Sequence, residues 1–174
     1  MVNRTMKRVA GASVAALFAL ALALPVQAEV KEEFHKTVPL SANGSVSLDN
    51  VNGGVEITGW NRNEVQIDAV KSASDQQKLN DMKIEVNGGG NNVEIKTTYA
   101  KHFMHNNPGG VQYTLHDPEK ARIDKVKLVN GSLTVQKLTG EINASLVNGK
   151  VQASDLTGTA DLATVNGTIE ADYN

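Results

Sequence analysis

The chain has 174 residues, a formal net charge of −2 and no cysteine. Such a length suffices for one domain with a real core, which disulfides cannot assist here. Without a basic excess, the chain lacks the positive patch that nucleic acids and anionic membrane surfaces require, so we expect neither as a partner. Few aromatic residues and many valines, asparagines and glycines favour short β-strands joined by tight turns.

The N-terminus has the pattern of a secretory signal peptide over residues 1–28. Three basic residues within positions 4–8 precede an apolar run from Val9 to Leu24, and Val26-Gln27-Ala28 fits the cleavage site. The apolar run is shorter than the roughly 20 residues that a membrane span needs. We expect this helical signal to be removed, with an uncleaved anchor as the alternative. Residues 29–174 then form a single domain with 14 basic and 19 acidic residues and no integral membrane segment.

Hydrophobic alternation predicts the first strands of this domain. They are expected at residues 33–40, where Pro39 ends the strand, and at residues 45–48, 55–58 and 64–71. Ser74 and Gln77 form a capping-box pattern, which predicts the one helix, Asp75 to Asp81.

A hairpin and an irregular segment are expected next. Ile84 and Val86 are predicted to pair with Val93 and Ile95 across a glycine- and asparagine-rich tip at residues 87–92. Residues 101–110 have no regular pattern, and strand alternation resumes over residues 111–115 before an Asp-Pro turn.

The C-terminal segment, residues 126–174, repeats one phrase every 18 residues. Val129-Asn130-Gly131 recurs as Val147-Asn148-Gly149 and as Val165-Asn166-Gly167, and Leu-Thr-Gly recurs at the same interval. Asn-Gly between alternating runs also suits an antiparallel meander. A solenoid, in which successive 18-residue turns of the chain (rungs) stack on one another, explains why the same side chain recurs at a fixed interval, and a meander does not. A hexapeptide helix, and the acyltransferase activity it would suggest, is excluded because Glu141 and Thr159 fall where that helix needs aliphatic residues.

The fold class that we predict is therefore all-β: a right-handed β-solenoid, or β-helix-like stack of short strands, with 18-residue repeats and one short helix near residues 75–81. In such a stack equivalent residues lie one strand spacing apart, roughly 4.8 Å. Asn130, Asn148 and Asn166 are then expected to form a structural ladder of side-chain amides.

Two stretches carry a resemblance to a known family. Residues 48–60, Leu48-Asp49-Asn50-Val51-Asn52-Gly53-Gly54-Val55-Glu56-Ile57-Thr58-Gly59-Trp60, resemble the opening signature of the bacterial putative-adhesin β-strand-repeat family, which is related to head-GIN and toastrack envelope domains. Residues 113–133 are similar to its strand, proline turn and repeat entry. The resemblance covers residues 33–174 and implies an exported β-solenoid with no established enzymatic activity. Since the chain stops partway through a third repeat, we expect either a minimal cap by Tyr173 or a truncation.

Three sets of residues could carry chemistry. His102, His105 and His116 could bind a divalent metal, or they are incidental residues of a polar loop. Trp60 could contact a partner, or it covers the end of the core. Carboxylates near the repeat turns could serve a glycan-active enzyme, or they only solubilise the turns; they are Glu141, Asp155, Asp161 and Asp172.

We predict no catalytic residue and no cofactor. The expected function is an exported, non-catalytic β-solenoid that acts as an adhesin-like, scaffolding or signalling surface in the periplasm or at the bacterial cell surface. Its partner would be an envelope protein or a cell-surface polymer. The alternatives are a glycan-active enzyme and a metal-binding envelope protein that uses the histidine loop.

Overall fold

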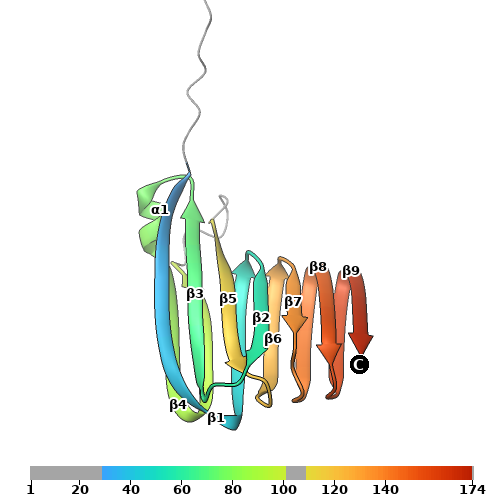
Figure 1. Ribbon diagram of the computed structural model, residues 1–174. Coiled ribbons are helices and arrows are strands. Elements are labelled where there is room, and N and C mark those ends of the chain that lie inside the picture. Colours follow the sequence, from blue (N-terminus) through green and yellow to red (C-terminus); the bar gives the residue numbers. More distant parts are fainter. Residues whose placement is uncertain (1–28, 101–108, 174) are drawn as a thin grey trace, which may run out of the picture.

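The computed structural model of the protein describes residues 29–100 and 109–173. In this part of the chain the fold is all-β with one short helix, as predicted (Figure 1). The elements are β1 (Val30–Asn52), β2 (Val55–Trp60), β3 (Glu64–Ala73), α1 (Gln76–Asp81), β4 (Met82–Tyr99), β5 (Gly110–Pro118), β6 (Arg122–Asn130), β7 (Leu133–Gln136), β8 (Ile142–Leu156) and β9 (Ala160–Tyr173).

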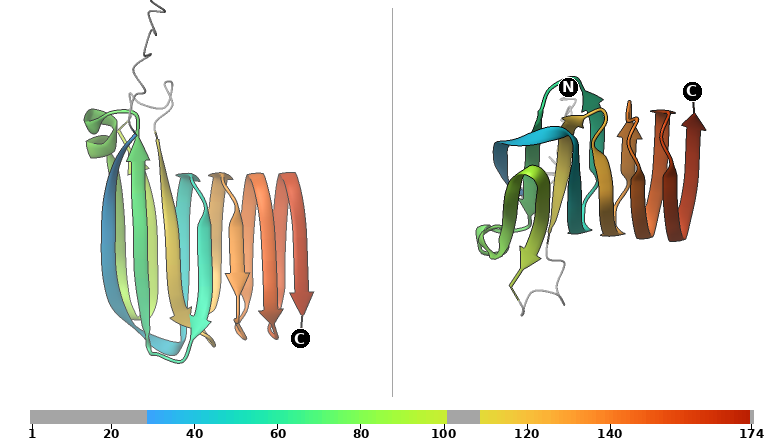
Figure 2. Two further views of the ribbon diagram at one scale, coloured as in Figure 1. Left: turned by 45° about the horizontal axis from the view of Figure 1, so that its top comes forward. Right: turned by 90° about the horizontal axis from the view of Figure 1, so that it is seen from below.

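The strands form two layers around one apolar core (Figure 2). The front layer contains, in order of pairing, the first part of β1, then β3, β5, β2 and β7, and the second parts of β8 and β9. The back layer contains β4, the second part of β1, β6, and the first parts of β8 and β9. Because β1 and β8 each run through both layers, strand pairing closes into a ring.

Pairing from β6 to β9 is parallel, which excludes the antiparallel meander for this segment. Leu128 lies opposite Leu146 in the back layer, and Leu133 lies opposite Val151 in the front layer. Val151 in turn lies opposite Ile169. Each of these partners is 18 positions away in the sequence, so the chain advances by one strand spacing for each copy of the phrase. β8 and β9 continue through Asn-Gly as single strands that pass from the back layer to the front layer.

The first half of the chain combines both pairing directions. β3 is antiparallel to β1 and β5, whereas β1 is parallel to β4 and β6. The predicted end of the first strand at Pro39 is wrong, because β1 continues to Asn52. Pro39 occupies the last position of the β1–β3 ladder, opposite Glu64, where it interrupts no following pair. The N–H of Leu40 then donates to the carbonyl of Asn63 at 3.0 Å.

Helix α1 lies where the sequence predicts it, but its cap differs. Asp75, not Ser74, is the N-cap residue, because its carboxylate accepts a 2.9 Å hydrogen bond from the N–H of Lys78. The helix contacts β1, β3 and β4, and its Leu79 is buried in the core.

The predicted hairpin lies within β4. The N–H of Ala100 donates to the carbonyl of Asp81 at 3.2 Å, so the two ends of β4 meet. Gly88, Gly89 and Gly90 between them have positive φ angles, which glycine adopts at little cost.

Alternating residues of the two layers fill the core. Tyr113 is its largest fully buried side chain, and its hydroxyl lies 2.8 Å from that of Thr97 across the core. Two residues with ionisable side chains interrupt this apolar pattern, Lys71 on β3 and Asp117 on β5. None of the helical structure in the described residues is long and apolar enough to cross a membrane.

Candidate functional site

The outward side chains of the front layer form two registered rows, which we call the polar face. The strands place them side by side because equivalent positions of neighbouring strands are paired. The first row contains His35, Asp68, Thr114, Glu56, Thr134, Gln152 and Glu170. The second contains Thr37, Gln66, His116, Thr58, Gln136 and Ser154. All of these residues are exposed or half-buried.

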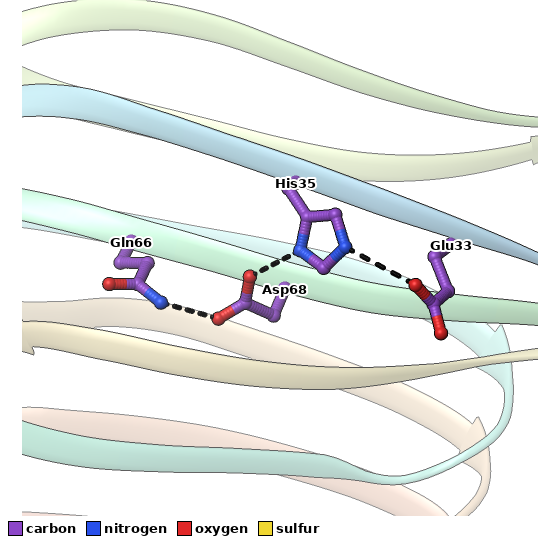
Figure 3. A network of polar contacts seen from close by, with 4 residues as sticks. All are labelled: Glu33, His35, Gln66 and Asp68. Atoms are coloured by element: carbon purple, nitrogen blue, oxygen red, sulfur yellow. Dashed lines mark hydrogen bonds and ion pairs between the residues drawn. The ribbon is translucent and has the colours of Figure 1, made fainter.

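A polar network lies at the β1 end of this face (Figure 3). Nδ1–H of His35 donates to Asp68 Oδ1 at 2.7 Å, and Nε2 of the same ring lies 3.6 Å from Glu33 Oε2. The side-chain amide of Gln66 donates to the other oxygen of Asp68 at 2.6 Å. His35 and Asp68 are 33 residues apart in the sequence and meet because β1 and β3 are antiparallel.

The network shifts the titration of two groups. The hydrogen bond to Asp68 raises the pKa of His35 above its ordinary 6.5, and Glu33 adds to the effect. The same bond, with that from Gln66, lowers the pKa of Asp68 below its ordinary 3.8. Both groups are largely solvated, so their charges are screened. The arrangement orients the imidazole, but the network contains no hydroxyl or thiol that the imidazole could activate as a nucleophile.

Trp60 lies at the end of β2, on the same side of the front layer. Its indole N–H donates to the carbonyl of Glu64 at 2.9 Å. The guanidinium carbon of Arg62 lies 4.7 Å from the ring centroid, within the range of a cation–π contact. The ring of His116 lies 5.3 Å away, tilted by 33°. Trp60 is half-buried and borders a hollow of about 190 Å³, so part of the residue remains accessible to a partner.

Asp117 follows His116 on β5, lies opposite Gly59 of β2 and points into the core. The residue is fully buried, and neither carboxylate oxygen has a hydrogen-bond partner. Burial without a compensating bond raises the pKa of Asp117 to about 7, because the charged form is penalised in an apolar environment. The neighbouring His116 also has a buried ring nitrogen, Nδ1, without a partner.

The repeated asparagines form a chain of side-chain hydrogen bonds. The amide of Asn166 donates to Asn148 at 3.0 Å, and that of Asn148 donates to Asn130 at 2.8 Å. Asn130 in turn donates to Asn52 at 2.9 Å, 78 residues earlier. This column lies at the corner between the layers, apart from the polar face.

The histidines of the predicted metal site are not brought together in the part of the chain that is described. His102 and His105 lie outside the described residues. His116 lies on the polar face, and its neighbour Asp117 points to the opposite side of β5. Within residues 29–100 and 109–173, no group of three or more histidine, aspartate or glutamate side chains is arranged to hold a metal ion.

The repeat carboxylates lie in different places. Asp161 is in the back-layer part of β9, and Asp172 is in its front-layer part. Glu141 precedes β8 and accepts a 3.4 Å hydrogen bond from Asn143. Asp155 has a positive φ angle of 54° near the end of β8.

Sequence reasoning missed the His35 network and the burial of Asp117. The signal that could have revealed the burial of Asp117 is the two-residue alternation of β5, because Asp117 follows Val111, Tyr113 and Leu115 on the inward side of that strand. The His35–Asp68 contact depends on the β1–β3 register, which no local pattern specifies.

No protein-family model and no curated protein matches this chain. Its fold is similar to that of a solved structure from Clostridium sporogenes, described as a putative cell adhesion protein, with a TM-score of 0.55 and 13% identity over 83% of this chain and 100% of that chain. Two structures from Parabacteroides distasonis match less well. A putative adhesin gives a TM-score of 0.30 and 11% identity over 82% of this chain and 69% of that chain. A putative lipid binding protein gives a TM-score of 0.31 and 14% identity over 82% of this chain and 73% of that chain.

The resemblance to putative adhesins that the sequence indicates is thus supported at the level of the fold. The chain has the fold of the Clostridium sporogenes protein, a putative cell adhesion protein.

Proposed function

We propose that the protein is an exported, non-catalytic β-solenoid, wound right-handed with 18-residue repeats, whose polar face binds a partner in the bacterial envelope. The partner is an envelope protein or a cell-surface polymer, and the protein acts as an adhesin-like, scaffolding or signalling surface. The signal-peptide pattern of residues 1–28 supports export. The description of the Clostridium sporogenes protein supports adhesion.

The observation that carries this proposal is the regularity of the polar face. Seven paired strands hold the first row and six of them hold the second, so hydrogen-bonding side chains of the first row repeat over roughly 29 Å at strand spacing. Backbone hydrogen bonding fixes these positions before a partner arrives, which reduces the entropy that binding must overcome. Exposed polar residues on a rigid sheet suit a broad, extended contact rather than a single deep pocket.

The chemistry of the face favours binding over turnover. Glu56, Asp68 and Glu170 give it an acidic character, and His35 is held by hydrogen bonds rather than aimed at a reactive group. The carboxylates of the glycan-active hypothesis are dispersed, since Asp161 lies in the back-layer part of β9 and Asp172 in its front-layer part. Trp60, with Arg62 on its ring, extends the face beyond β2 and offers an apolar contact beside the polar rows.

Two measurements on the purified protein test the proposal. Co-sedimentation with an envelope fraction should show saturable binding, and incubation with cell-wall polysaccharides should show no hydrolysis or elimination product. Turnover that a single aspartate-to-asparagine change abolishes would contradict the non-catalytic function. Absence of any saturable binding would contradict the binding function.

A further inference from the structure

Lys71 interrupts an otherwise aliphatic pattern on the inward side of β3. Val65, Ile67, Ala69 and Ala73 occupy the other inward positions, and all are buried. Lys71 is only 8% exposed. A buried ammonium group is costly unless it is paired, so a site that served packing alone would be expected to hold an aliphatic residue.

Two oxygens lie near the ammonium group of Lys71. Its Nζ lies 2.7 Å from Glu32 Oε1 of β1 and donates to the carbonyl of Met82 at 3.3 Å. The side chain of Glu32 is 49% exposed, whereas that of Lys71 is 10% exposed. The acidic partner can therefore turn into solvent, while the ammonium group stays in place.

The pair lies in a groove of about 440 Å³ at the β1 edge of the core. The first part of β1 forms one wall and the first part of β4 forms the other, and these two segments are not paired with each other. Phe34, Met82 and Ile84 supply an apolar lining beside Lys71 and Glu32, and the rest of the lining is polar, from Asn80, Lys83 and Glu85. Further along, Nζ of Lys36 donates to the carbonyl of Val86 at 3.2 Å and ties the two walls together.

We propose that this groove binds a carboxylic-acid amphiphile, with its carboxylate on Lys71 Nζ in place of Glu32 and its aliphatic chain along Phe34, Met82 and Ile84. The headgroup is assigned as a carboxylate because a carboxylate already occupies that position, at 2.7 Å. The groove volume lies within the roughly 300–1,000 Å³ of small-molecule sites. This function goes beyond the polar face, because the groove lies on the inward side of the front layer.

Calorimetric titration of the purified protein with decanoate at pH 8, below its micelle-forming concentration, tests the assignment. Decanoate should bind saturably, and decanol and decyl phosphate should bind at least tenfold more weakly. Lys71→Met should weaken decanoate binding at least tenfold, because the chain length is kept and the charge is lost. Glu32→Gln should strengthen binding about threefold or more, because the competing carboxylate is removed. Lys150→Met, which breaks a 2.8 Å ion pair with Glu170 at the other end of the front layer, should change nothing.

Each of the following results would overturn the proposal: no saturable binding, equal binding of decanol, tighter binding of decyl phosphate, or an unchanged affinity in Glu32→Gln. Thermal melts of Lys71→Met and Glu32→Gln accompany the titrations and show whether each variant is folded. If Lys71→Met does not fold, the Glu32→Gln result decides, since that change leaves the buried ammonium group and its backbone contact in place.

Discussion

The side-chain amide of Asn148 donates a 2.8 Å hydrogen bond to the side-chain carbonyl of Asn130, 18 residues earlier in the sequence. Its own carbonyl accepts the next bond, from Asn166 at 3.0 Å. We therefore expect Asn148→Leu to destabilise the fold by about 0.5–1.5 kcal/mol per lost bond. Urea denaturation measures this change. Asn143→Leu is the control, because Asn143 makes only a 3.4 Å bond to Glu141. Equal effects of the two substitutions would contradict a stabilising column.

Gly149 and Gly167 each pack against the carbonyl of the glycine in the preceding phrase, and Gly131 packs against the carbonyl of Gly53, which follows Val51-Asn52. A Cβ added to Gly131 would approach the carbonyl oxygen of Gly53 more closely than real Cβ atoms approach other heavy atoms. Gly131→Ala should therefore destabilise the fold by about 1–3 kcal/mol, the range for overpacked sites. Ser132→Ala, one residue later and exposed, is the control in the same melting experiment. An unchanged melting temperature in Gly131→Ala would contradict the close approach of the rungs.

The buried Asp117 predicts that stability falls as pH rises. In the folded chain its pKa is raised to about 7 from the ordinary 3.8, so between these values the folded chain holds the proton that the unfolded chain has lost. The contribution of Asp117 to stability is therefore greatest below about pH 4, falls as pH rises toward 7 and levels off above it. The full contribution is about 4 kcal/mol by linkage.

Asp117→Asn isolates this contribution, because the amide is uncharged at every pH. It should stabilise the protein at pH 8 and remove most of the slope between pH 4 and 7. Guanidinium denaturation at a series of pH values gives both quantities. Asp172→Asn, at an exposed position of β9, should leave the slope intact. A slope that survives in Asp117→Asn would show that other groups cause it.

The contacts of His35 predict which of two substitutions lowers its pKa more. The pKa of His35 lies above 6.5, chiefly through its hydrogen bond to Asp68 and to a smaller extent through Glu33. Asp68→Asn should therefore lower the pKa of His35 more than Glu33→Gln does. Titration of the imidazole resonances by NMR measures both shifts. The reverse order would mean that the 2.7 Å contact is not the dominant one.

Signal-peptide processing is open to a direct test. If the signal peptide is removed at the predicted site, the N-terminal residue of the exported protein is Glu29. Ala28→Arg should block cleavage, because the site requires a small residue at this position. N-terminal sequencing of the two proteins distinguishes removal from a retained anchor, in which the sequence would begin upstream of Glu29 in both.

The parallel stacking of β6 to β9 could be predicted because the sequence repeats there. An identical phrase at a fixed interval specifies which residues become neighbours, so Asn148 identifies Asn130 as its partner without further information. The sequence alone indicates only a tight turn at the glycines of the phrase. Their positions opposite the preceding carbonyls show that close stacking between rungs also requires them.

The architecture before residue 126 could be predicted only in part. The strand at residues 64–71 and the helix follow from alternation and capping, which are local. The continuation of β1 past Pro39 and its antiparallel pairing with β3 depend on contacts between distant segments, and no repeat marks them. Hence the His35–Asp68 pair and the groove at Lys71 emerge only from the three-dimensional arrangement. The inward placement of Lys71 itself was already implied by the alternation of β3.

The central claim is that the polar face binds an envelope partner. The most direct test compares two double variants, one with two lysines on the polar face and one with two lysines on the opposite side of the molecule. Thr134→Lys with Gln152→Lys alters the polar face, and Asn143→Lys with Ser145→Lys adds the same charge to the outer side of the back layer. Dissociation constants for an envelope fraction are measured by co-sedimentation for both proteins and for the unaltered chain. We predict at least tenfold weaker binding for the first pair and an unchanged constant for the second. Equal constants for the two pairs, or a loss confined to the second, would contradict the claim.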